Sequence, residues 1–171
     1  MLGIYDNFPL NIHRTETFTS PLSRKKIQQK ITETFQRINQ ERLTFEEVGN
    51  PTIPNSQVIF EFGIADGGNF CYLNEEEAQK LQNSLTNEPL QNMDWFCLIR
   101  YYKNTEQKVK RPLKFDYYML RISFGDKGTV EVQIFHERGP RYLSPEDLAT
   151  FIARKVNGLS ARKTLKQIEQ D

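Results

Sequence analysis

Histidine and cysteine are the residues in this 171-residue sequence best suited to binding a metal ion. His13, His136, Cys71 and Cys97 are the only four, and they lie far apart along the chain. Structural zinc sites usually space their paired ligands about two to four residues apart. We therefore predict no metal site and no cofactor, and we expect both cysteines to be reduced core residues, because disulfides are rare inside cells.

The triplet His136-Glu137-Arg138 has the residue types of an acid–base site. A strand without a bulge, however, places His136 and Glu137 on opposite faces, so the two cannot act on one substrate atom. We interpret His136 as a locally bonded strand residue, and Glu137 with Arg138 as a surface ion pair of small energetic value.

Two further patterns match catalytic or ligand-binding motifs only in their letters. Asp94 followed by Glu106-Gln107-Lys108 suggests a nuclease metal site, but Glu106 falls in an expected loop, where a carboxylate is not held at metal distance. The glycines of residues 63–68 run from a strand into a turn and lack the lysine and helix of a phosphate loop. The sequence thus provides no catalytic residue.

The most informative stretch of the chain is basic and rich in tyrosine. Residues 98–141 hold ten lysines and arginines against five acids, whereas residues 41–97 hold ten acids and two bases. Tyrosine beside arginine on a sheet is suited to stacking unpaired bases, with nearby lysines neutralising phosphates. The same side chains are equally suited to an acidic protein segment. The candidate binding residues are Arg100, Tyr102, Lys103, Lys110, Arg111, Lys114, Tyr117, Arg121, Arg138 and Arg141.

Three functional hypotheses follow from these side chains. The first is a non-enzymatic interaction module, or small adaptor subunit, that binds a protein partner through a basic, tyrosine-rich sheet surface. The alternative is a nucleic-acid-binding domain for single strands or structured RNA, and the third is an enzyme of unknown class. A plain structural role for the same residues also fits, with the tyrosines at core edges and the lysines keeping a hairpin soluble. A homo-oligomer through a sheet edge is compatible with each.

The expected cellular location follows from two features that the sequence lacks, a membrane-spanning run and a secretory signal. No run approaches the roughly 18 apolar residues that a bilayer-spanning helix needs. The N-terminus shows no basic segment followed by a long apolar stretch, as a secretory signal would. We expect a cytoplasmic protein without membrane contact.

Helices are indicated by caps and by apolar spacing. Ser20-Pro21 predicts the start of a first helix, with serine as N-cap and proline at the first helical position. Asn74 predicts the N-cap of a second helix, and Ser144-Pro145 that of a third. The first helix carries an apolar stripe at spacings of four, four and three residues, which consists of Ile27, Ile31, Phe35 and Ile38.

Strands are indicated by alternating apolar residues and by turn signals. The expected strands are residues 10–19, 42–48, 58–64, 69–73, 95–102, 115–124 and 129–137. The turns at residues 66–68 and 125–128 join neighbouring strands as hairpins, and hairpins pair antiparallel.

Together these elements predict an α+β fold. We expect a largely antiparallel twisted sheet of about six to seven strands, with about three helices packed mainly on one face. Residues 1–158 are expected to form a single domain, and residues 159–171 a polar C-terminal helix or tail.

Overall fold

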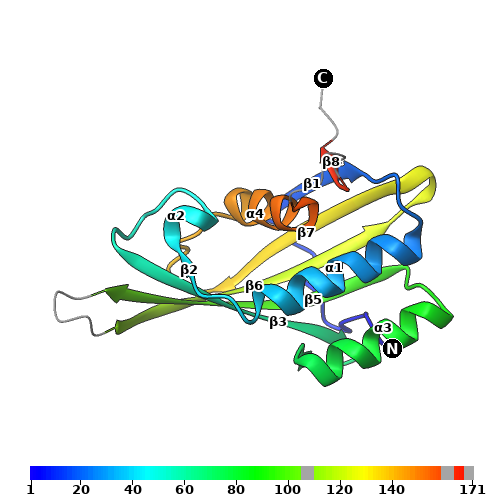
Figure 1. Cartoon of the computed structure of the whole chain (residues 1–171), viewed down its shortest axis with the longest axis horizontal. Helices are drawn as coiled ribbons and strands as arrows, with labels where there is room; N and C mark the ends of the chain where they lie inside the picture. The colour runs from blue at the N-terminus through cyan, green and yellow to red at the C-terminus, as the bar shows by residue number, and fades with distance from the viewer. Residues whose placement is uncertain (105–109, 159–163, 168–171) are drawn as a thin grey trace.

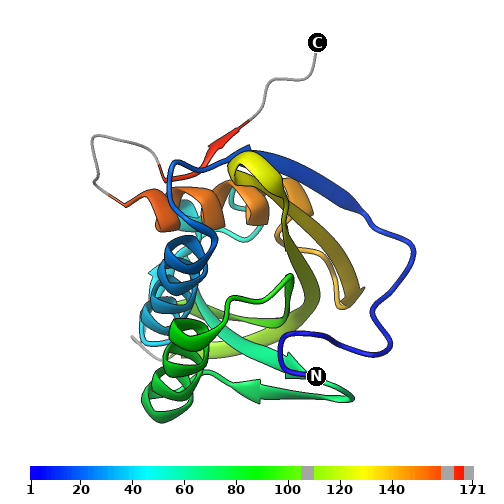
Figure 2. The same cartoon turned by 90° about the vertical axis from the view of Figure 1, so that its right-hand side faces the viewer.

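The α+β architecture and the antiparallel sheet are confirmed by a computed structural model of the chain, which describes residues 1–104, 110–158 and 164–167. The sheet is strongly curled, and the helices lie on its concave side (Figures 1 and 2). None of the helices in these ranges is long and apolar enough to cross a membrane.

All strand pairs of the sheet are antiparallel, in the order β2-β3-β5-β6-β7-β1-β8, and β4 pairs with the same strand, β3, as β2 does. β5 and β6 are the longest strands, and their far ends project beyond the helices as a two-stranded ribbon (Figure 1). The strands are β1 Arg14–Thr19, β2 Leu43–Thr44, β3 Ser56–Asp66, β4 Asn69–Tyr72, β5 Asn92–Asn104, β6 Lys110–Phe124, β7 Thr129–Arg138 and β8 Lys166–Gln167.

The helices of seven or more residues are α1 Arg24–Ile38, α3 Glu75–Asn87 and α4 Pro145–Asn157. α1 and α4 lie inside the curl of the sheet, and α3 lies beside α1 (Figure 2). The predicted caps of α3 and α4 are confirmed, since Asn74 Oδ1 accepts from the backbone N–H of Glu77 at 2.8 Å and Ser144 Oγ from that of Asp147 at 3.0 Å.

The predicted start of α1 at Ser20-Pro21 is wrong. The helix begins at Arg24, and its N-cap is Ser23, whose side chain accepts from the backbone N–H of Lys26 at 3.3 Å. Ser20 instead belongs to the end of the sheet, because its N–H donates to the Gly128 carbonyl at 2.8 Å. The tertiary contact of Ser20 outweighs its local capping preference.

The expected strand at residues 42–48 is only partly formed. Its first part is β2, and the remainder is a short helix, α2, at Phe45–Val48. The Glu47 side chain accepts from the backbone N–H of Thr44 at 3.2 Å, which caps the first turn of α2. Phe45 and Val48 are buried, so this turn closes one end of the core.

The core lies between the concave face of the sheet and the helices. The predicted stripe of α1 is buried, and so are the alternating side chains of β3, which are Val58, Phe60, Phe62 and Ile64. Trp95 is fully buried against Phe35, with ring centroids 4.8 Å apart. At the C-terminal end of the described chain, Leu165 is buried and β8 pairs with β1.

No helix covers the convex face of the sheet in Figure 2, but the N-terminal segment, residues 1–13, crosses part of it. The Gly3 N–H donates to the Ala65 carbonyl at 2.7 Å, and the Asp94 N–H donates to the Gly3 carbonyl at 2.7 Å. At the other end of the segment, His13 N–H donates to Ile134 O at 2.9 Å. The part of the convex face nearer the projecting ribbon lies beyond this segment.

Candidate docking surface

Alternation along β6 separates two neighbouring tyrosines. Tyr118 faces the concave side and is fully buried, as is Tyr101 on β5. Tyr117 faces the convex side and is half-buried. Of the tyrosines in the basic stretch, Tyr117 and Tyr102 are therefore the two on the outer surface of the sheet.

Tyr117 belongs to a row of aromatic rings across the convex face. Its ring centroid lies 5.2 Å from that of Phe96 on β5 and 5.1 Å from that of Phe115 on β6. Phe96 is in turn 5.6 Å from Phe70 on β4, and Tyr5 of the N-terminal segment lies 4.6 Å from Phe70. We call these five residues the aromatic row. Its outer end is the most open, because Phe115 is 44% exposed.

Two predicted cations flank the aromatic row. Arg100 on β5 is exposed, and its Nε lies 3.1 Å from Glu61 Oε1. Arg138 on β7 places its guanidinium carbon 4.8 Å from the centre of the Tyr117 ring, and its Nε donates to Glu137 Oε2 at 3.0 Å. The surface ion pair predicted for Glu137 and Arg138 is therefore confirmed.

Arg121 has a different environment from the other predicted cations. Its guanidinium donates two hydrogen bonds to the fully buried Asp94 carboxylate, at 2.7 and 2.8 Å, and stacks on the Phe8 ring at 4.3 Å. The hydrogen bond to Asp94 raises the pKa of Arg121 above its usual value. Arg121 thus fastens the N-terminal segment to the sheet, and the structure does not leave it on the open surface.

Four predicted cations lie on the projecting ribbon. Lys103 and Arg111 are direct cross-strand partners, whereas Lys110 pairs with Asn104, and Lys114 is exposed. None of the four has an ion-pair partner among the described residues. We call residues 100–104 and 110–114 the basic ribbon. The remaining part of the expected hairpin loop, residues 105–109, lies outside the described residues.

Arg141, the last predicted cation, is held near a buried carboxylate by its backbone. Its N–H donates to Asp116 Oδ1 at 2.7 Å, and the Tyr142 N–H donates to Asp116 Oδ2 at 2.9 Å. The same carboxylate accepts from the Tyr101 hydroxyl at 2.7 Å and lies 2.8 Å from His136 Nε2. Asp116 therefore ties β5, β6 and β7 to the loop that leads into α4.

Asp116, His136 and Tyr101 are the described residues that come closest to a catalytic cluster. All three side chains are packed inside the protein, and none of them lines the four hollows of about 220–720 Å³ at the surface of the described residues. Burial, with Asp116 as the next cause, raises the pKa of Tyr101 far above its usual value. The arrangement satisfies buried polar groups and offers a substrate no access.

Metal and thiol chemistry find no support in the described residues either. Their side chains form no group of three or more metal-ligand residues. The cysteines are unpaired; Cys97 is buried as expected, but Cys71 is exposed. The nuclease-like pattern lies partly outside the described residues, because residues 106–108 do, and its Asp94 is engaged by Arg121.

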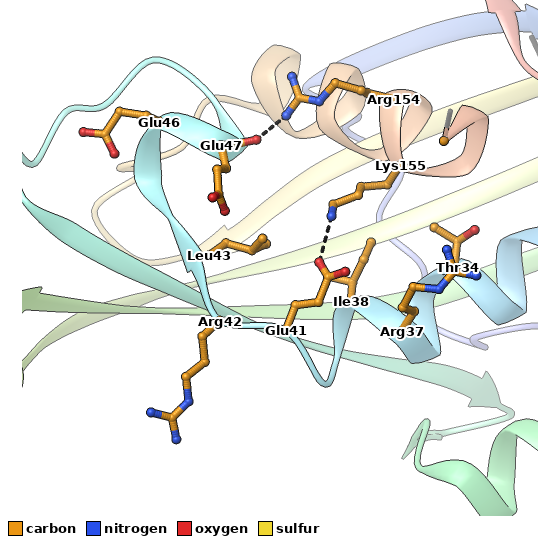
Figure 3. A pocket seen from close by; sticks show the side chains of 11 residues that line it. Thr34, Arg37, Ile38, Glu41, Arg42, Leu43, Glu46, Glu47, Arg154 and Lys155 are labelled. Carbon is orange, nitrogen blue, oxygen red and sulfur yellow. Dashed lines mark hydrogen bonds and ion pairs between the residues drawn. The ribbon is translucent and has the colours of Figure 1, made fainter. Parts of the chain in front are cut away.

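A hollow of about 720 Å³ lies between α1, α2 and α4 (Figure 3). Its charged side chains bind the protein itself. Lys155 Nζ lies 2.8 Å from Glu41 Oε2, and the Arg154 guanidinium donates to the Glu47 carbonyl (Figure 3). These contacts join the ends of two helices, so we interpret the hollow as a structural junction.

Sequence reasoning missed four members of the aromatic row, which are Tyr5 of the N-terminal segment and three phenylalanines of the sheet. Phe70, Phe96 and Phe115 lie on three different strands and come together only through the strand order. Their alternation with buried neighbours was visible in the sequence, but the pairing of β3 with both β4 and β5 was not. Comparisons of the chain with protein-family models, with curated proteins and with solved structures find no match.

Proposed function

We propose that this chain is a non-enzymatic protein-binding module, which docks an acidic segment of a protein partner on its convex sheet face. The docking surface consists of the aromatic row beyond the N-terminal segment together with the basic ribbon. The observation that carries the proposal is their continuity: aromatic side chains on a face without helices lead directly into a ribbon of five lysines and arginines, of which only Arg100 has an ion-pair partner among the described residues. Buried aromatic anchors and complementary charge are the usual means of protein recognition.

The charge of the partner follows from the ribbon. Lys103 lies directly opposite Arg111, and like charges at such positions destabilise a strand pair. Lys110 and Lys114 add two more cations nearby. Alternation places Lys110 on the same side of the ribbon as Tyr102, and Lys103 with Arg111 on the other side. An acidic segment on the convex face therefore contacts Lys110, while the two charges behind it add to the positive field of the ribbon.

The packing of the rings favours a protein over a nucleic acid. Bases stack on ring faces that are free. Here the Phe115 ring meets Tyr117 edge-on, at 87°, and the guanidinium of Arg138 covers Tyr117. Tilted, mutually packed rings with flanking ion pairs suit the apolar side chains of a protein.

The test compares two polymeric probes by fluorescence anisotropy at low salt. A labelled random copolymer of glutamate and tyrosine represents the acidic segment, and a labelled oligouridylate represents single-stranded nucleic acid. We expect the copolymer to bind and the double variant Tyr117→Ala with Lys110→Ala to weaken it about tenfold or more, because alternation places Lys110 on the same side of the ribbon as Tyr102. Arg121 is unsuitable for substitution, because its loss would leave buried Asp94 unpaired and destabilise the fold by about 3–5 kcal/mol.

The matched control removes charge elsewhere. Lys25 and Lys26 are exposed at the start of α1, on the helical side of the protein, and their double alanine variant should bind the copolymer as the wild type does. Tighter binding of oligouridylate than of the copolymer would overturn the proposal in favour of nucleic-acid recognition. If the control variant loses as much affinity for the copolymer as the docking-surface variant, the weaker binding reflects the lower net charge and no specific surface.

A further inference from the structure

A hollow of about 220 Å³ opens within the docking surface, between β3, β4 and β5. It is lined by Glu61, Phe62, Gly63, Phe70, Tyr72 and Phe96. The hollow exists because Gly63 has no side chain at a position between two strands that carry aromatic rings. Gly63 is itself required, since a Cβ there would lie 2.9 Å from the Cys71 carbonyl oxygen of β4.

The size and lining of this hollow limit what it can hold. Pockets for complete small-molecule ligands usually measure about 300–1,000 Å³, and this one is smaller. Its walls are rings of Phe70, Phe96 and the 47% exposed Tyr72. One large apolar side chain fits such a space, and aromatic walls favour an aromatic one.

A charged group lies at a defined position beside the hollow. Arg100 contacts Glu61, which lines the hollow, but its guanidinium carries five N–H donors, more than one carboxylate can occupy. Arg100 pairs across the sheet with Ile59, four residues before Gly63 on β3, and its guanidinium reaches Glu61, two residues before Gly63. Two to four residues of an extended chain span about 7–13 Å. A partner segment lying along β3 would thus reach both places.

We infer that the hollow is the anchor pocket of the docking surface, and that it takes a large apolar side chain, preferably aromatic, from an acidic extended segment of the partner protein. A carboxylate about two to four residues from that side chain binds Arg100. The inference rests on the proposed function and adds its specificity: the partner is recognised by an aromatic residue close in sequence to an acidic one. A single buried anchor of this kind usually supplies much of the binding energy.

The experiment measures binding of polyglutamate and of the glutamate–tyrosine copolymer, matched in length, to the full chain. Wild-type protein should bind the copolymer about tenfold more tightly than polyglutamate, the difference that one anchor side chain commonly makes. Phe70→Ala removes a wall of the pocket and should abolish this preference. Phe135→Ala is the matched control, because Phe135 is a half-buried ring on β7, which β6 separates from the strands of the pocket.

The outcomes separate the pocket from the surface as a whole. If Phe70→Ala unfolds the chain, Tyr72→Ala tests the same wall at an exposed position. A preference that persists in a folded pocket variant, or that is absent in the wild type although both polymers bind, overturns the anchor pocket and leaves the docking surface standing. Failure of both polymers to bind the wild type overturns the proposed function itself, and the pocket with it.

Discussion

Asp116 shows how single residues organise the interior behind the docking surface. Its carboxylate accepts hydrogen bonds from the Tyr101 hydroxyl and from two backbone N–H groups, and it contacts the His136 ring. A buried carboxylate is tolerated only with such partners, because an unsatisfied buried charge is costly. Gly139 belongs to the same arrangement, since a Cβ at this position would lie 2.5 Å from Asp116 Oδ1.

The buried tyrosines next to Asp116 make the free energy of unfolding depend on pH in the alkaline range. Burial, followed by the Asp116 charge, raises the pKa of Tyr118 well above the value near 10 of an unfolded chain. Below about pH 10 the folded and unfolded states both hold the proton, so Tyr118 has no effect on the pH dependence. Above it, only the unfolded chain loses the proton, and the free energy of unfolding falls by about 1.4 kcal/mol per pH unit for each such group.

Urea unfolding of the wild type and of Tyr118→Phe, between about pH 8 and 11, measures this contribution. The variant should lose stability at neutral pH, by about 1 kcal/mol, because the hydrogen bond from Tyr118 to the Leu143 carbonyl is gone. Above about pH 10, the free energy of unfolding of the variant should fall less steeply with pH than that of the wild type, by the slope that one proton contributes. Parallel slopes in the two proteins would show that Tyr118 ionises freely in the folded state.

At the scale of elements, α4 is the helix whose start is best specified. Ser144 caps it, Pro145 is its first residue, and Leu143 and Leu148 are buried on either side of the cap. Ser144→Ala should lower the free energy of unfolding by about 1 kcal/mol. The control is Ser84→Ala inside α3, where alanine is the better helix former and should cost nothing. An unchanged stability for Ser144→Ala would contradict the capping role.

Elements with a strong local pattern were predictable from the sequence. The alternation of Phe60 and Phe62, the stripe of α1 and the cap at Ser144 all depend on residues within a few positions of one another. Ser20 was misread because its partner, Gly128, lies more than a hundred residues away. Local chemistry alone could not separate Ser20 from the true cap, Ser23.

The candidate site was predictable only in part, for the same reason. The basic ribbon follows from charge counting along one hairpin, and Tyr117 from alternation along one strand. The engagement of Arg121 by Asp94, and the meeting of Phe70 with Phe96, depend on strand order and on the path of the N-terminal segment. A single sequence does not contain that order in any local pattern.

At the scale of the whole molecule, the two faces of the curled sheet differ in what they contact. Its concave face holds the helices and the core, so the convex face and the projecting ribbon are available for contact (Figures 1 and 2). The N-terminal segment covers one part of the convex face and leaves the part with Phe115 and Tyr117 open. Under the proposed function, shape and charge would direct an acidic partner to this side of the protein.

The central claim is that this side of the protein contacts another protein, and photo-cross-linking in cells tests it most directly. The photoreactive residue p-benzoylphenylalanine would replace Phe115 on the docking surface, and, as a control, the exposed Gln79 on α3. The account predicts a discrete, nuclease-resistant protein adduct from position 115 and none from position 79. An adduct from position 79 but not from position 115, or one that nuclease removes, would contradict it.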